Sequence, residues 1–117
     1  MIRARDTKGF RLLMIDGPCP PGHKVDPAQS IEVARLAVDS CLYPLFEVEH
    51  MHYTINYHPA QKVPVKECLK KQGRFRHLFR DEKGIEVLRD IQSHTDVYWE
   101  QLNARERNTV AEVVPGD

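Results

Sequence analysis

The loop at residues 17–22 constrains the fold of this chain more than any other segment. It reads Gly-Pro-Cys-Pro-Pro-Gly. Its prolines lack the N–H donor, and its glycines adopt backbone angles that other residues avoid, so no regular structure can run through it. Residues 10–16 (Phe-Arg-Leu-Leu-Met-Ile-Asp) precede the loop as a short apolar run and predict a buried strand. The loop is therefore expected where a strand passes over to a helix.

The helix after the loop is predicted to begin near Asp26. Asp26 can cap it, Pro27 suits the first helical position, and Gln29 stands three residues after the cap. Helical spacing predicts a buried face made of Ile31, Ala34, Val38 and Cys41. Residues 45–49 follow as a second strand. Strand, loop, helix and strand predict one βαβ unit and hence an α/β fold with a parallel sheet.

The remaining sequence predicts a hairpin-like return and two helices. Residues 51–57 have strand composition, and a short helix is expected between Pro64 and Gly73. The last helix is predicted from about residue 85 to residue 102, with one apolar stripe formed by Ile85, Leu88, Ile91, Tyr98 and Leu102. Residues 1–107 are expected to form one unit and residues 108–117 a loosely held tail. Since a parallel sheet needs more strands and cover on both faces, the chain resembles the end of a larger α/β domain.

Composition excludes several classes of protein. Lys and Arg number 17 and are balanced by 17 Asp and Glu, which argues against a nucleic-acid partner. No apolar run approaches the ~20 residues of a membrane span, and no secretory h-region follows the N-terminus, so no membrane partner is expected. Three cysteines, an odd number, do not suggest a disulfide framework. We expect a reducing, cytoplasmic setting.

Cys19 is the residue best placed for chemistry. A stiff loop at the carboxyl end of a parallel strand is where α/β folds place ligands, and it fixes the direction of a thiolate for metal ligation. The alternative is a small buried apolar residue, which is the commoner role of a single cysteine. An iron–sulfur cluster takes four thiolates. Cys41 and Cys68 lie on predicted helices and are interpreted as core positions, so the other ligands would come from another chain.

Two further patterns have a metal or phosphate interpretation. His50 and His52 would share one face of a strand and suit zinc or copper, but without a third ligand a partly exposed face is favoured. The segment 66–80 can contact phosphates or an acidic partner, although a solvated helix face with aromatic anchors is favoured. Its basic and aromatic residues are Lys70, Lys71, Arg74, Arg76, Arg80, Phe75 and Phe79. The sequence has no glycine-rich phosphate loop, nucleophile elbow or Cys-x-x-Cys. No complete active site can be identified.

Four segments follow one another in a distinctive order. They are the loop at 17–22, Ile-Glu-Val-Ala-Arg-Leu-Ala-Val at 31–38, Tyr-Pro-Leu-Phe-Glu-Val-Glu at 43–49, and a stretch at 63–78 that contains Gln-Gly-Arg-Phe. In this order they resemble the C-terminal region of the beta subunit of pyruvate:ferredoxin oxidoreductase and other 2-oxoacid:ferredoxin oxidoreductases. The resemblance extends from about Asp6 to about Leu102. The stretch at 63–78 is its most distinctive part.

The resemblance implies the C-terminal portion of a thiamine-diphosphate-binding-type parallel-sheet domain with a long C-terminal helix. It implies part of an enzyme that oxidatively decarboxylates a 2-oxoacid such as pyruvate to an acyl-CoA and passes electrons through a [4Fe-4S] cluster to ferredoxin. Cys19 is the implied fourth ligand of that cluster, and the other three lie outside the chain. Thiamine diphosphate and Mg²⁺ would be bound elsewhere. The implied partners are the other subunits or segments, ferredoxin, the 2-oxoacid and coenzyme A.

Two departures from the family pattern change what is expected. His23 stands where the family commonly has Trp, which bears on packing beside the loop. The Gly-Asp-Gly…Asn segment that holds the diphosphate is absent, as are the three other cluster cysteines. The chain is therefore expected to be a split subunit or a fragment and to be inactive alone. The alternative is a non-catalytic structural or assembly module, although such a module has no need of a stiff thiolate loop.

Overall fold

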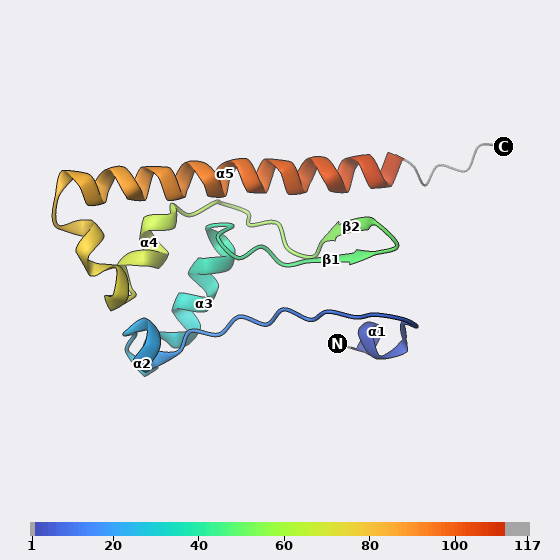
Figure 1. Cartoon of the computed structure of the whole chain (residues 1–117), viewed down its shortest axis with the longest axis horizontal. Helices are drawn as coiled ribbons and strands as arrows, with labels where there is room; N and C mark the ends of the chain where they lie inside the picture. Colours follow the sequence, from blue (N-terminus) through green and yellow to red (C-terminus); the bar gives the residue numbers. More distant parts are fainter. Residues whose placement is uncertain (1, 112–117) are drawn as a thin grey trace.

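The computed structural model describes residues 2–111, in which short elements gather along one side of a long helix (Figure 1). In chain order the elements are α1 (Ile2–Asp6), α2 (Pro20–His23), η1 (Pro27–Gln29), α3 (Ser30–Asp39), β1 (Phe46–Glu49), β2 (His52–Ile55), α4 (Val65–Lys70), η2 (Gly73–Phe79) and α5 (Glu82–Ala111). Contacts with α5 come from β2, α4 and η2, while α3 packs on α4. The fold mixes helices with a small sheet and has the expected long C-terminal helix.

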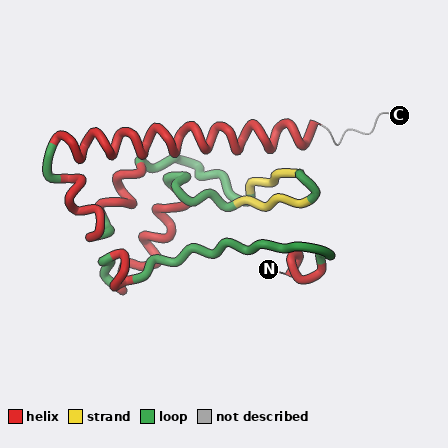
Figure 2. Tube along the Cα trace, viewed as in Figure 1, coloured by secondary structure: helices red, strands yellow, loops and turns green. Residues whose placement is uncertain are grey.

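The sheet differs from the one predicted. β1 and β2 pair antiparallel, with Phe46 opposite Ile55 and Glu49 opposite His52. Residues 10–16, predicted as a buried strand, instead run as an extended loop without a strand partner among the described residues (Figure 2). Residues 10–16 do not pair as a strand, and β1 pairs with β2 across a two-residue turn. Because a βαβ unit needs two parallel strands, none forms within residues 2–111. The parallel-sheet domain is not confirmed.

The loop at residues 17–22, predicted to be irregular, passes at Pro20 into the short helix α2, because proline suits the first turn of a helix. The predicted helix begins where the capping pattern predicts, and its buried face matches the predicted one only in part. The Asp26 side chain accepts a hydrogen bond from the Ala28 amide at 3.0 Å, and the first turn is the 3₁₀ helix η1. The core around α3 contains Val25, Val33, Ala37 and Cys68. Ile31, predicted to be buried, is 72% exposed. Of the other predicted positions, Cys41 is buried and Ala34 and Val38 are half-buried. The buried face is displaced from the predicted stripe because α4 and the segment before α3 pack on the neighbouring face.

Helix α5 is longer than predicted and meets the rest of the chain through both apolar and polar side chains. Of the predicted stripe, Leu102 is buried, but Ile85 and Tyr98 are exposed. Leu88 and Ile91 are half-buried. Side-chain oxygens of α5 also accept backbone N–H donors: Gln92 from Val65 at 2.8 Å, Glu106 from Ile55 at 2.6 Å and Thr109 from Tyr53 at 3.2 Å. These bonds supply acceptors for two N–H groups of β2 and for the first N–H of α4, which has no acceptor within its own helix.

The predicted boundary near residue 107 falls inside α5, which continues to Ala111. The remainder of the predicted tail, residues 112–117, lies outside the described residues. The division into residues 1–107 and 108–117 thus stays a prediction. Within residues 2–111, none of the helices is both long and apolar enough to cross a membrane.

Candidate functional site

Cys19 follows the extended segment, residues 10–16, and stands immediately before the short helix α2 (Figure 1). The loop around it is fastened by backbone hydrogen bonds. The His23 amide donates to the Cys19 carbonyl at 2.8 Å, and the Val25 amide donates to the Pro20 carbonyl at 3.0 Å. Val25 is 5% exposed and belongs to the core. The loop is therefore held at its C-terminal side by packing and by its own backbone bonds.

The Cys19 thiol is free and exposed. Its sulfur lies over Gly22, where an added Cβ would stand 3.4 Å from Sγ. A single accessible soft donor fits one ligand position of an iron–sulfur cluster, which needs four. Among residues 2–111, no group of three or more His, Cys, Asp and Glu side chains is placed to hold a metal ion. A cluster at Cys19 would thus take its other ligands from outside the described part of the chain.

The two other cysteines lie in the core, as predicted. Cys41 and Cys68 are each 1% exposed. Burial raises the pKa of both thiols above the ordinary value. Since a metal is bound by the thiolate and not by the thiol, this environment disfavours ligation. Of the three cysteines, Cys19 is the one suited to a shared metal site.

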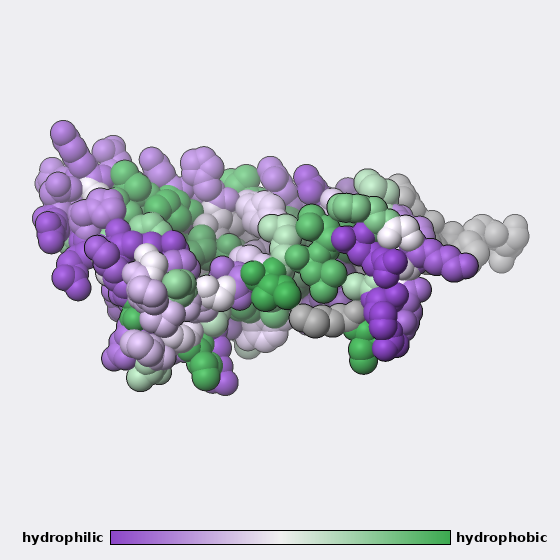
Figure 3. All heavy atoms as spheres, turned by 60° about the horizontal axis from the view of Figure 1, so that its bottom comes forward, coloured by the Kyte–Doolittle hydropathy of each residue, from purple (hydrophilic) through white to green (hydrophobic). Residues whose placement is uncertain are grey.

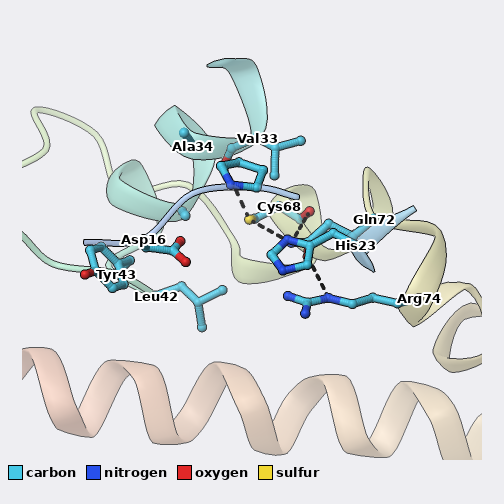
Figure 4. A pocket seen from close by; sticks show the side chains of 11 residues that line it. Asp16, His23, Val33, Ala34, Leu42, Tyr43, Cys68, Gln72 and Arg74 are labelled. Atoms are coloured by element: carbon cyan, nitrogen blue, oxygen red, sulfur yellow. Dashed lines mark hydrogen bonds between the residues drawn. The ribbon is translucent and has the colours of Figure 1, made fainter. Parts of the chain in front are cut away.

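A pocket of about 120 Å³ opens beside the Cys19 loop, between that loop and the elements α3, α4 and η2 (Figure 4). Asp16, His23, Gln72 and Arg74 supply its polar lining, and Figure 4 shows the last three on the same side. Arg74 Nε donates to Gln72 Oε1 at 3.0 Å. Gln72, 4% exposed, donates through Nε2 to the Cys68 carbonyl at 3.4 Å. Residues on both sides of Cys19 and residues of the segment that follows α4 therefore line the same pocket.

The Gln-Gly-Arg-Phe stretch is thus a neighbour of the Cys19 loop, a proximity that was not predicted from the sequence. Two features tie it to the loop and to the core. The Gly73 amide donates to the Lys24 carbonyl at 2.9 Å, and Gln72 Nε2 donates to the carbonyl of the core residue Cys68 at 3.4 Å. The signal available in the sequence was the glycine at residue 73, since a glycine between polar and aromatic residues marks close backbone approach.

The other sequence patterns do not form sites. His50 lies in the turn between β1 and β2 with a φ of 52°, whereas His52 begins β2, so the two do not share a strand face. In the basic segment, Lys71 pairs with Glu32 at 3.1 Å and Lys70 pairs with Glu67. Those partners agree with the favoured interpretation of an ordinary charged surface.

Comparison with known proteins identifies relatives but no matching family model. The chain is 35% identical over 100 residues to pyruvate synthase subunit PorB of Methanothermobacter marburgensis, and the aligned region covers 86% of this chain and 33% of that protein. It is 35% identical over 107 residues to PorB of Thermotoga maritima, covering 92% and 33%. Ketoisovalerate oxidoreductase subunit VorB of Pyrococcus furiosus is 37% identical over 102 residues, covering 86% and 31%.

The matches cover nearly all of this chain and only part of each relative. The chain spans about one third of the length of these curated proteins. Identity above one third over about 100 residues, repeated across pyruvate and ketoisovalerate subunits, agrees with the resemblance carried by the four ordered segments. The chain belongs to the beta-subunit family of the 2-oxoacid:ferredoxin oxidoreductases, and its match is consistent with a C-terminal part of such a subunit.

Proposed function

We propose that this chain works as part of a 2-oxoacid:ferredoxin oxidoreductase, to which it contributes Cys19 as one ligand of a [4Fe-4S] cluster and surfaces for its partners. One observation carries the proposal: a chain similar to PorB and VorB over most of its length presents an accessible thiol on a proline-stiffened loop. The assembled enzyme would convert a 2-oxoacid such as pyruvate to an acyl-CoA in the cytoplasm. Its further partners would be the 2-oxoacid, coenzyme A and ferredoxin.

The role of the loop is to hold one sulfur in a constant place. A bound cluster would supply one-electron transfer between the site of decarboxylation and ferredoxin. Pro18, Pro20 and Pro21 restrict the backbone on both sides of Cys19, and the Cys19 carbonyl is tied to the His23 amide. A fixed thiolate lowers the conformational entropy lost on ligation. Thiamine diphosphate and Mg²⁺ would be held outside this chain, which by itself would be inactive.

The extended segment at residues 10–15 is the proposed surface for the rest of the enzyme. Phe10, Leu12 and Met14 are 92%, 71% and 75% exposed, and Ile15 on the opposite side is 74% exposed. Strands buried on both faces are apolar on both sides, as in parallel sheets covered by helices. We propose that these residues form a strand in a parallel sheet completed by the part of the subunit that this chain does not span. Figure 3 shows apolar atoms at the surface on the side of the molecule that carries the extended segment.

The test is the substitution Cys19→Ser in the assembled complex. A hydroxyl is a poor replacement for a soft thiolate on iron, so one cluster should be lost or converted. Decarboxylation of the 2-oxoacid should persist while electron delivery to ferredoxin falls. Iron and sulfide analysis with low-temperature EPR of the reduced complex measures the cluster.

Cys68→Ser is the matched control because its thiol is buried in the core. It should keep the iron content and lower stability by about 1 kcal/mol, the effect of a buried hydroxyl. An unchanged cluster count and spectrum in Cys19→Ser would contradict the ligand role. That outcome would favour the alternative, a non-catalytic structural or assembly module derived from this subunit.

A further inference from the structure

Gly73 lies where the Cys19 loop meets the start of η2, nearly fifty residues further along the chain. Its amide donates to the Lys24 carbonyl at 2.9 Å. A Cβ at residue 73 would stand 2.8 Å from the Lys24 Cβ and 3.0 Å from the Lys24 carbonyl oxygen. Real Cβ atoms essentially never come closer than 3.0 Å to such atoms. Any side chain at residue 73 would therefore push Lys24 away.

Lys24 has little freedom to move alone. It holds a left-handed conformation with φ 51° and ends α2. The residues on both sides of Lys24 are held in place. The His23 amide donates a hydrogen bond to the Cys19 carbonyl, and the amide of Val25, a buried core residue, donates to the Pro20 carbonyl. A displacement of Lys24 is thus transmitted through one turn of backbone hydrogen bonds to Cys19.

We propose that Gly73 is a positioning residue for Cys19. The close backbone contact between Gly73 and Lys24 sets the place of residues 17–25 on the core, and with it the place of the Cys19 sulfur. The contact itself follows from the fold, whereas its importance for a metal ligand rests on the proposed function. Gln72 and Arg74 flank the contact and bond to each other, which fixes the backbone of η2 at this point.

Hydrogen exchange measured by mass spectrometry on the full chain tests the proposal. Gly73→Ala should accelerate amide exchange in the peptide that covers residues 17–25 by roughly ten-fold, the change that follows from losing about one backbone hydrogen bond. Exchange in α5 should not change. Gly17→Ala is the control because a Cβ there meets nothing within 4 Å. It should leave the exchange of the same peptide within about two-fold of the parent chain.

A compensating substitution distinguishes positioning from general loss of structure. Lys24→Gly removes the Cβ that the new side chain would strike and suits a φ of 51°. The double variant Lys24→Gly with Gly73→Ala should therefore recover most of the protection lost in Gly73→Ala. The remaining contact, 3.0 Å to the carbonyl oxygen, needs a shift of only a few tenths of an ångström.

Three results would overturn the positioning role. They are unchanged exchange in Gly73→Ala, an equal acceleration throughout α5, and no recovery in the double variant. None of these measurements depends on iron. A failure of the ligand role, seen as an intact cluster in Cys19→Ser, is thus separate from a failure of the contact between Gly73 and Lys24.

Discussion

At the scale of single residues, the chain places several side chains in backbone conformations that favour glycine. Lys24, Cys41, His50 and Met51 all have positive φ, between 51° and 66°. A left-handed conformation destabilises a residue with a Cβ by about 1–2 kcal/mol. His50 and Met51 form the whole connection between β1 and β2, and positive φ at both positions is the geometry of a tight hairpin turn. Met51 is 74% exposed, so its side chain adds little packing.

Met51→Gly should stabilise the chain. The gain is expected to be roughly 0.5–1 kcal/mol in the free energy of unfolding, because relief of the strained φ exceeds the added entropy of the unfolded chain. Urea unfolding followed by circular dichroism measures it. Met51→Ala keeps the Cβ and should give no such gain. Equal changes in both variants would show that side-chain loss and not backbone strain determines stability here.

At the scale of elements, α5 acts as a polar partner for the edge of a small sheet. Ile55 is 6% exposed, and its amide donates to Glu106 Oε1. The Thr109 hydroxyl oxygen accepts a hydrogen bond from the amide of Tyr53, which lies two residues before Ile55 on β2. A buried N–H without a partner destabilises a fold by about 1–3 kcal/mol, and a free strand edge can pair with another chain. Polar residues at these positions of α5 therefore have a structural role that a search for apolar stripes overlooks.

Glu106→Ala should lower the free energy of unfolding by about 1–3 kcal/mol, because it leaves the Ile55 amide without its acceptor. Glu106→Gln retains an acceptor oxygen and should lose much less. Glu100→Ala, at an exposed position of the same helix, should change stability by no more than about 0.5 kcal/mol. Thermal unfolding of the three variants gives the comparison. Equal losses for alanine and glutamine at residue 106 would argue against the hydrogen bond.

A second link between α5 and the rest of the chain depends on pH. The ion pair with Lys62, followed by the hydrogen bond from Gln92, holds the pKa of Asp96 below its ordinary value of 3.8. A carboxyl whose pKa is lower in the folded chain stabilises it above the unfolded pKa, and this contribution disappears as the pH falls through the folded pKa. Both side chains are partly exposed, so the contribution is below about 1 kcal/mol.

Asp96→Asn should therefore destabilise the chain at neutral pH and make little difference well below pH 3.8, where the parent chain has lost the same contribution. Urea unfolding across this range measures the difference between the two proteins. Asp90→Asn, at an exposed position of α5, serves as the control. A difference between Asp96→Asn and the parent that stays constant down to the acid range would exclude the ion pair as its cause.

At the scale of the whole molecule, the described part of the chain is elongated and leaves apolar residues uncovered. The extended segment contacts the remainder at a few polar points, among them the hydrogen bond from the Tyr43 hydroxyl to the Met14 carbonyl at 3.0 Å. Its apolar side chains project from both sides into solvent. An exposed, apolar, extended backbone is a template for pairing with another chain.

The purified chain should therefore self-associate. Leu12→Lys combined with Met14→Lys places charges on one side of the extended segment and should reduce the apparent mass in size-exclusion chromatography with light scattering. Both residues are already exposed, so the thermal transition should be retained. Val97→Lys on α5 is the control, since Val97 is 54% exposed and lies on another element. A parent chain that is a monomer with a cooperative transition would argue against the missing partner.

Features that depend on neighbouring residues were predictable from the sequence. The cap at Asp26 and the existence of the last helix follow from local backbone chemistry. The loop at residues 17–22 was predicted to be irregular throughout, which is wrong for its second half, because Pro20, Pro21 and Gly22 belong to α2. The burial of Cys41 and Cys68 was also predicted, although Cys41 lies in the turn after α3 and not on the helix. For the candidate site, the sequence supplied the thiol, its stiff loop and the family.

Features that depend on distant residues were not predictable. Whether residues 10–16 pair as a strand depends on a neighbour that the described chain does not provide, and the direction of β1 depends on β2. The buried face of α3 is the one that packs against α4 and Val25. Val25 precedes α3 in the sequence and α4 follows it, so neither contact could be read from α3 itself. The contact of Gly73 with Lys24 joins the start of η2 to the end of α2, and a glycine indicates a close approach without indicating which distant segment it meets. Strand pairing, helix faces and loop docking are long-range packing, and local propensity and periodicity contain no information about which distant surface is present.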